Sequence, residues 1–285
     1  MRVQRLDAEQ MLSAVREITG IELVVSGALD GGQVGAARVR WPDGHEGVLK
    51  WRPDCDVKDM RGGPIAATEA LRARAYPAPA TELVVQVGTA VVTVQELLPG
   101  SKIDFLDEQL FDHVLALHSL HVGALAGRED VPRTALYLRD DGPGYCLHEP
   151  LRQFSTQTAD LERRIRRIGG DCDEHLSGFD VVHLDFHANN MLSSGDDVTG
   201  VIDWDGSGRG DAAFDLVTLR FGIHPAGASP AVIRHLDALL DEMPDDVLRP
   251  AWAHMSLRMT DWAIRHFSSD EVEKWVRFSA GRLIA

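Results

Sequence analysis

The first hundred residues alternate between apolar and polar positions with the two-residue period of β-strands. IELVV, GAARVRW and GVLKW follow this pattern, and the turn sequence Pro42-Asp43-Gly44 separates the last two. A turn of this composition between two such segments is typical of a hairpin. ELVVQVG and AVVTVQELL predict a second hairpin centred near Gly88. The chain is therefore expected to begin with a β-rich lobe.

One helix is expected between the two hairpins. Pro64 opens PIAATEALRARAY, whose small and apolar residues suit a helix, and Pro77 and Pro79 end it. After Pro99 and Gly100 the period changes to that of helices. The pattern therefore predicts an α+β protein with a β-rich lobe over residues 1–98 and a mainly α-helical lobe over residues 99–285.

Helix signals recur through the second lobe. DEQLFDHVLALHSLH carries an apolar stripe at helical spacing. Ser229 before Pro230 predicts an N-cap with proline at the first helical position, and Ser268 with Glu271 predicts a capping box. The stripe consists of Leu110, Val114, Leu117 and His121.

Composition excludes several classes of protein. No apolar run reaches the 18 residues of a membrane span, and the N-terminus lacks the apolar core of a secretory signal. Three scattered cysteines, Cys55, Cys146 and Cys172, form no C-x-x-C pair, so neither a disulfide framework nor a zinc ribbon is expected. We expect a cytoplasmic protein, either a monomer or a homodimer.

The charge is strongly negative. The chain carries a net charge of −15, and residues 99–285 hold 18 basic and 31 acidic side chains. Such a field repels nucleic acid and anionic lipid and attracts cations. It predicts a small cationic ligand and no nucleic-acid or membrane partner, although solubility alone is an equal explanation.

The stretch HLDFHANN places polar residues directly after the apolar segment VV. His183, Asp185 and Asn190 match the pattern H-x-D followed by four residues and Asn, in which the aspartate accepts a hydroxyl proton and the asparagine binds a metal. A second apolar segment then delivers Asp203. Oxygen ligands of this kind suit Mg²⁺ beside a nucleotide phosphate, with ATP or GTP as the cosubstrate.

The first lobe offers a phosphate clamp. Lys50 ends the strand GVLK, and Glu69 on the following helix is its expected partner. The turn GALDGGQVGAA, with Gly32 and Gln33, could cover phosphates with backbone N–H groups, although it lacks the G-x-G-x-x-G spacing and could be a flexible hairpin.

Structural explanations stand beside these functional ones. His183 and His187 could instead bind zinc, but such a site would leave Lys50, Asn190 and Asp203 unexplained. Other residues are expected to have structural roles: Asp211 and Asp215 as an N-cap and a loop-bracing acid, Trp204 as core, and Trp252 and Trp262 as core with substrate stacking as the alternative.

Taken together, these motifs resemble the aminoglycoside phosphotransferase family in order and spacing over nearly the full chain. The resemblance implies a bilobal protein-kinase-like fold with Asp185 as the catalytic base and with Asn190 and Asp203 as magnesium ligands. It also implies that Lys50 pairs with Glu69 on the α- and β-phosphates.

Further roles follow from the same resemblance. Residues 96–98 become the hinge, with Glu96 and Leu98 facing adenine, and His183 braces the loop. Leu184 and Asn189 stand where glycine is common in the family.

The sequence therefore predicts an ATP- or GTP-dependent O-phosphotransferase that acts on a hydroxyl of a small cationic molecule. An antibiotic, either an aminoglycoside or a basic cyclic peptide, is the expected acceptor, and Asp205 and Asp261 are the expected contacts to it. One alternative is a metabolic kinase for choline, a sugar or a homoserine-like acceptor. Another is a catalytically silent nucleotide-binding protein. A protein kinase is disfavoured because no A-P-E segment follows Asp203.

Overall fold

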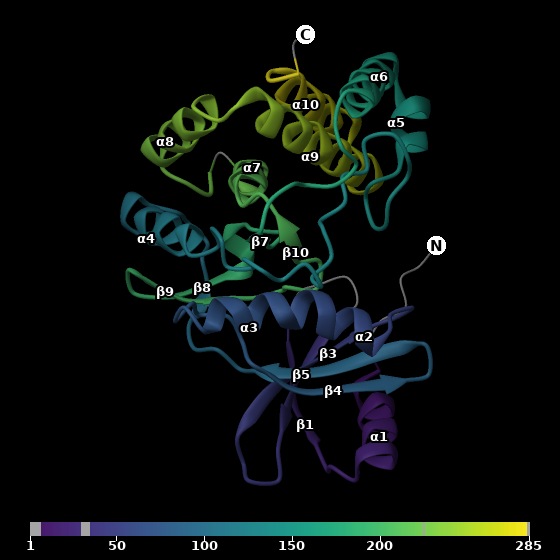
Figure 1. Ribbon diagram of the computed structural model, residues 1–285, viewed down its shortest axis with the longest axis vertical. Coiled ribbons are helices and arrows are strands. Elements are labelled where there is room, and N and C mark those ends of the chain that lie inside the picture. The colour runs from purple at the N-terminus through teal and green to yellow at the C-terminus, as the bar shows by residue number, and fades with distance from the viewer. Residues whose placement is uncertain (1–6, 30–34, 225, 284–285) are drawn as a thin grey trace.

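A computed structural model of the chain describes residues 7–29, 35–224 and 226–283. Its N-terminal part is built on a five-stranded antiparallel sheet with the strand order β1-β2-β3-β5-β4 (Figure 1). Side chains alternate across β3, where Leu49 and Trp51 enter the core between the sheet and α1 while Lys50 faces the other way. The strands are β1 Val24–Leu29, β2 Ala36–Arg40, β3 Glu46–Arg52, β4 Thr81–Val87 and β5 Ala90–Glu96.

Two helical segments flank this sheet. α1, Ala8–Thr19, begins at the N-cap Asp7 and buries Leu12 and Val15. The second segment runs without a break through α2 Val57–Met60, the π-helical turn η1 Arg61–Ile65 and α3 Ala66–Arg72. The expectation that Pro64 opens this helix is wrong. Asp56 caps the segment by accepting from the backbone N–H of Lys58, and Pro64 lies inside the wider π turn.

The C-terminal part is mainly helical (Figure 1). Two small antiparallel sheets lie between its helices and the N-terminal sheet: β6 Ser101–Lys102 pairs with β8 Met191–Ser194, which pairs with β9 Asp197–Val201, and β7 Asp180–Val182 pairs with β10 Gly208–Gly210. The helices are α4 Glu108–Ser119, α5 His148–Phe154, α6 Thr156–Gly170, α7 Ala213–Gly222, α8 Pro230–Asp241, α9 Asp245–His266 and α10 Ser269–Ala280.

The helix ends test two sequence signals. Ser229 caps α8 by accepting from the N–H of Val232, as predicted. The prediction of a capping box at α10 is wrong. Ser268 is the N-cap, but its side chain makes no capping hydrogen bond, and Glu271 pairs with Lys274 instead. The α+β class is confirmed, and the expected boundary at residue 98 falls between β5 and β6.

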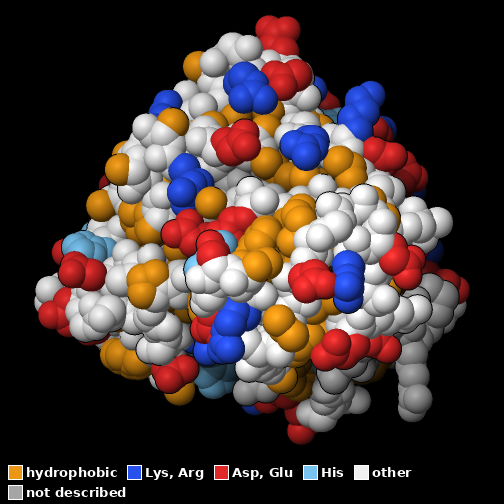
Figure 2. Space-filling view, turned by 90° about the horizontal axis from the view of Figure 1, so that it is seen from below, with side chains coloured by type: hydrophobic (Ala, Val, Ile, Leu, Met, Phe, Trp, Pro, Cys, Tyr) orange, Lys and Arg blue, Asp and Glu red, His pale blue; other side chains and the backbone are white. Residues whose placement is uncertain are grey.

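A large core unites α4, α7, α8, α9 and α10, and Trp204 and Trp252 are fully buried in it as expected. No helix in the described part of the chain has the length and apolarity needed to span a bilayer. On the face seen from below, acidic and basic side chains are interspersed with apolar ones (Figure 2).

Candidate active site

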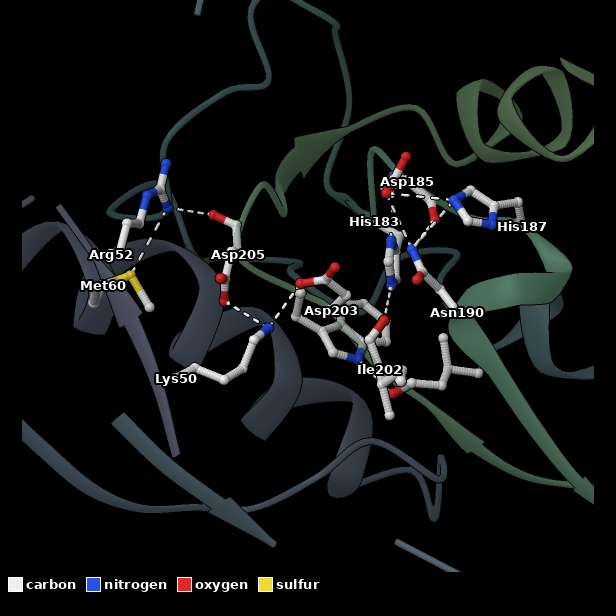
Figure 3. Close-up of polar contacts among 12 residues, drawn as sticks. Lys50, Arg52, Met60, His183, Asp185, His187, Asn190, Ile202, Asp203 and Asp205 are labelled. Atoms are coloured by element: carbon white, nitrogen blue, oxygen red, sulfur yellow. Dashed lines mark hydrogen bonds and ion pairs between the residues drawn. The ribbon is translucent and has the colours of Figure 1, made fainter. Parts of the chain in front are cut away.

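Two adjacent strand ends form the site. β7 ends at Val182 and leads into the loop of residues 183–190, and β9 ends at Val201 just before Asp203. The two segments are held together because the backbone N–H of Ile202 donates to the carbonyl of Asn190 at 2.9 Å. Figure 3 shows the polar side chains of both segments gathered opposite Lys50.

His183 braces this junction from within. It is fully buried, its Nδ1 accepts from the N–H of Asp185 at 3.2 Å, and its Nε2 lies 3.0 Å from the carbonyl of Ile202 (Figure 3). Burial lowers the pKa of this imidazole, so it is neutral. Both ring nitrogens are therefore engaged within the loop, which excludes His183 as a zinc ligand.

Asp215, on α7, fixes the backbone of the same loop. Its buried carboxylate accepts from the N–H groups of His183 at 2.8 Å and of Leu184 at 3.0 Å. Leu184 has a φ of 72°, a left-handed conformation that is strained for leucine and that explains why glycine suits this position. Asp211 instead accepts from the N–H of Ala213 at the start of α7. Asp215 is thus the acid that braces the loop. Asp211, which was expected to support the loop or to cap the helix, does neither, because the N-cap of α7 is Ala212 and has no side-chain capping bond.

Three donors surround the carboxylate of Asp185. Arg258, on α9, donates from Nη2 to Oδ1 at 2.8 Å, Asn190 donates from Nδ2 to Oδ2 at 3.0 Å, and His187 Nε2 lies 3.4 Å away. Burial acts to raise the pKa of Asp185, but the hydrogen bond from His187 and the charge of Arg258 outweigh it and hold the pKa well below its usual range. The carboxylate is therefore ionised and oriented.

Lys50 reaches across from β3. Its ammonium donates to Asp203 at 2.7 Å and lies 3.4 Å from Asp205 (Figure 3). Burial acts to lower the pKa of Lys50, but the two carboxylates outweigh it and raise the pKa above its ordinary value. Asp203 has a φ of 68°, so the chain turns sharply where this acid meets the lysine.

The expected pairing of Lys50 with Glu69 is therefore corrected. Glu69 is exposed on α3, whereas the preceding Thr68 is buried. Since successive residues on a helix point about 100° apart, the face of α3 that packs inward carries Thr68 and leaves Glu69 in solvent.

The expected adenine side is only partly described. Gly32 and Gln33 lie outside the described residues. Glu96 ends β5, where its side chain accepts from Arg72 at 2.8 Å and from the N–H of Ala80 at 3.1 Å. Leu98 packs beside Gly200 of β9. The side chain of Glu96 is thus committed to contacts within the fold.

The residues expected to hold magnesium fit that ion. The amide nitrogen of Asn190 donates to Asp185, so its amide oxygen is the atom that would bind the ion. Asp203 supplies a carboxylate. Mg²⁺ is commonly held by one or two protein oxygens together with phosphates and water. Among the described residues, no three His, Cys, Asp or Glu side chains are arranged to hold a metal by themselves, which disfavours the zinc alternative.

Asp185 also borders a pocket of about 990 Å³ whose walls are formed largely by α7, α9 and α10. Trp262 is half-buried and lines it, so of the two tryptophans expected in the core only Trp252 is there. Arg258 and His187 also line the pocket beside Asp185.

Neither acid expected to bind the acceptor lies in this pocket. Asp261 is fully buried, where it accepts from Arg265 at 2.6 Å and from the N–H of Leu147 at 3.0 Å. Asp205 lies with Lys50, and its carbonyl accepts from Arg52 (Figure 3). Both expectations are therefore corrected: Asp261 holds α9 to the loop before α5, and Asp205 lies beside Lys50 rather than in the pocket.

Arg258 was not identified as a residue of the site from the sequence alone. It lies 73 residues beyond Asp185, outside every motif. The available signal was an arginine within the apolar segment HMSLRMTDW of a long helix, because an isolated charge on a buried face requires a partner.

The family comparison agrees with this geometry. A model of the phosphotransferase enzyme family matches residues 30–254, which is most of the chain. The chain belongs to this family. The protein is accordingly a kinase-like phosphotransferase. A comparison with curated protein sequences finds no match.

Solved structures show the fold of this phosphotransferase. Aminoglycoside phosphotransferase APH(4)-Ia, in a ternary complex with AMP-PNP and hygromycin B, aligns with a TM-score of 0.61 at 15% identity over 97% of each chain. Spectinomycin phosphotransferase APH(9)-Ia, in complex with ADP and spectinomycin, aligns with a TM-score of 0.59 at 14% identity over 98% of this chain and 99% of that one. The protein-kinase-like bilobal fold is thus confirmed, while such low identity leaves the acceptor open.

Proposed function

We propose that this phosphotransferase moves the terminal phosphoryl group of ATP or GTP to a hydroxyl of a small molecule, and that the acceptor is an antibiotic. The observation that carries the proposal is the placement of Asp185. It lies between the group formed by Lys50, Asp203 and Asp205 and the pocket of about 990 Å³. One side of Asp185 thus suits phosphates and the other an acceptor. Related structures that contain nucleotide together with hygromycin B or spectinomycin support both partners.

Each residue has a proposed task in this reaction. Asp185 orients the acceptor hydroxyl and accepts its proton as the hydroxyl oxygen bonds to the γ-phosphorus and the bond from that phosphorus to the bridging oxygen breaks, which releases the nucleoside diphosphate. A carboxylate of such low pKa is a weak base, so its main contribution is orientation of the hydroxyl.

Lys50 neutralises the phosphates, and His183 and Asp215 keep the loop in register. Asn190 and Asp203 would hold Mg²⁺, which when bound supplies positive charge against the phosphate oxygens.

One experiment tests this proposal. The purified chain is incubated with Mg²⁺, labelled ATP or GTP and a panel of hydroxylated antibiotics, and products that gain the mass of one phosphate are identified. The expected result is transfer to at least one antibiotic. Transfer confined to choline, a sugar or homoserine would favour the metabolic kinase, and nucleotide binding without transfer to any alcohol would favour the catalytically silent protein.

A further inference from the structure

The lining of the pocket next to Asp185 is unsuited to a molecule with many positive charges. Among the described residues that line it, only Asp185 and Glu271 are acidic, whereas Arg220, Arg258 and Lys274 are basic. The acidic surplus of residues 99–285 therefore does not extend into the pocket.

Both lining carboxylates already have cationic partners. Asp185 is paired with Arg258 at 2.8 Å, and Glu271 is paired with Lys274. The third lining cation is paired as well, because Arg220 donates to Asp237 at 2.9 Å. A ligand ammonium group would therefore have to displace one of these cations before it could pair with a lining carboxylate. Because breaking an existing ion pair offsets what a new one contributes, the lining gains little from several ammonium groups and selects against polycations.

The apolar part of the lining is extensive. Trp262 and Trp275 lie edge to face with ring centroids 6.5 Å apart, and Phe267 packs on Trp262 at 4.7 Å although 46% of Phe267 is exposed. Met255 and Met259 supply flexible apolar surface from α9. Large aromatic side chains left partly exposed around a concavity are typical of a site for an apolar ligand.

The volume sets the size of that ligand. About 990 Å³ is at the upper end of the range for sites that enclose drug-sized molecules. Asp185 forms part of the wall, and its side chain keeps 36% of its surface accessible, so a hydroxyl of a molecule in the pocket can reach it.

We infer that the acceptor is a bulky alcohol with a large apolar or aromatic surface and no cluster of ammonium groups, bound against the ring cluster of Trp262, Phe267 and Trp275. This inference rests on the proposed function, because it assigns the pocket to the acceptor. It replaces the expectation of a cationic acceptor, which was drawn from the charge of the whole lobe.

Equilibrium binding without nucleotide tests this inference separately from catalysis. The probes are chloramphenicol, a neutral aromatic diol, its deacylated amine, which keeps the ring and both hydroxyls but carries an ammonium group, and the polycation hygromycin B. Titration calorimetry is expected to give a Kd for chloramphenicol at least tenfold lower than for either cation. An equal or reversed order, or no measurable binding of the neutral probe, would overturn the inference.

Two variants connect the binding to the pocket. Trp262→Ala is expected to weaken chloramphenicol binding about tenfold or more, and Met259→Asp is expected to weaken it while strengthening binding of the cations. Val122→Asp, at a position 57% exposed and outside the pocket lining, is the matched control and should change neither. Equal effects of Met259→Asp and Val122→Asp would contradict the assignment.

Turnover distinguishes the two proposals. If chloramphenicol binds as expected but no antibiotic of the panel gains a phosphate, the proposed function fails and only the preference of the pocket for a neutral apolar ligand stands. If hygromycin B is phosphorylated and binds more tightly than chloramphenicol, the proposed function stands and the pocket assignment fails.

Discussion

Arg258 holds Asp185 from the opposite side of the loop: Nη2 donates to the carboxylate at 2.8 Å, and Nη1 donates to the carbonyl of Leu184 at 2.7 Å. One guanidinium thus fixes both the side chain and the backbone of the proposed base. Because it is supplied by α9, a helix that also lines the acceptor pocket, the position of the base is tied to the wall of that pocket.

Replacing Arg258 by alanine should change the pH dependence of the enzyme. The charge of Arg258 is one of the causes that hold the pKa of Asp185 below its usual range, so its loss raises that pKa. Since only the carboxylate form accepts the proton, the acidic limb of the kcat profile is expected to move to higher pH. Arg249→Ala, at an exposed position on the same helix, is the control and should leave the limb where it is. If the acidic limb does not move in Arg258→Ala, the guanidinium does not contribute to the low pKa of Asp185.

Replacing Asp185 itself should remove catalysis and spare nucleotide binding. Asp185→Ala is expected to lower kcat by roughly two to four powers of ten. The polar partners of its carboxylate, Arg258, Asn190 and His187, all belong to the C-terminal part, so the Kd for ATP, measured by calorimetry, should stay within a few-fold of the wild type. Near-normal turnover would reject its role as the base.

Lys50→Ala should affect the nucleotide instead. Removing a charge-assisted contact to phosphate costs about 1.5–3 kcal/mol, which corresponds to roughly a ten- to hundredfold higher KM for ATP. The KM for the acceptor should change little, because Lys50 does not line the pocket and lies on the far side of Asp203 from Asp185 (Figure 3). Lys58→Ala, an exposed lysine on α2, serves as the comparison and should leave both constants unchanged. A change confined to the acceptor KM would contradict this division of the site.

Gly222 offers a test of loop position that touches no reacting group. A Cβ built at Gly222, at the end of α7, would lie 2.4 Å from Cβ of His187, so Gly222→Ala must push the loop away from the helix. We expect a loss of roughly a hundredfold in kcat, because small displacements of positioned groups are costly. Gly170→Ala, where the added methyl meets nothing within 4 Å, should be silent. Retained activity in Gly222→Ala would show that the loop tolerates displacement.

His254 should make the fold sensitive to acid. Burial and then the charge of Arg258 lower its pKa from 6.5 to about 3. Between these values the unfolded chain binds a proton that the folded chain excludes, so the free energy of unfolding falls as the pH falls, by up to about 1.4 kcal/mol per pH unit.

Urea melts from pH 7 to pH 4 should show a smaller loss of unfolding free energy in His254→Gln. The amide oxygen of this glutamine can accept from the N–H of Tyr137, as the ring nitrogen does, but it does not titrate. Equal slopes in the two proteins would assign the acid sensitivity to other groups.

The part of the site that the sequence predicted is the part encoded locally. His183, Asp185 and Asn190 lie on one loop, and Asp203 follows the next hairpin, so strand ends alone bring them together. Lys50 is also fixed by alternation along one strand. Patterns of period two are sufficient for such placements.

The remaining contacts depend on long-range packing. Glu69 lies on the expected helix but on its exposed face, since the helical segment begins at Val57 and passes through a π turn before reaching it. The pocket is lined by apolar residues of α7, α9 and α10 whose spacing is that of ordinary core positions. Only the crossing of these helices leaves Trp262 and Trp275 facing a cavity.

The contact between Lys50 and Asp203 joins residues 153 positions apart, one on the N-terminal sheet and one beyond β9. A phosphate that takes the ammonium must loosen this tie. Nucleotide binding therefore replaces a direct ion pair between the two halves of the molecule with contacts that run through the phosphate. The rigidity of the free enzyme and that of the nucleotide complex thus depend on different interactions.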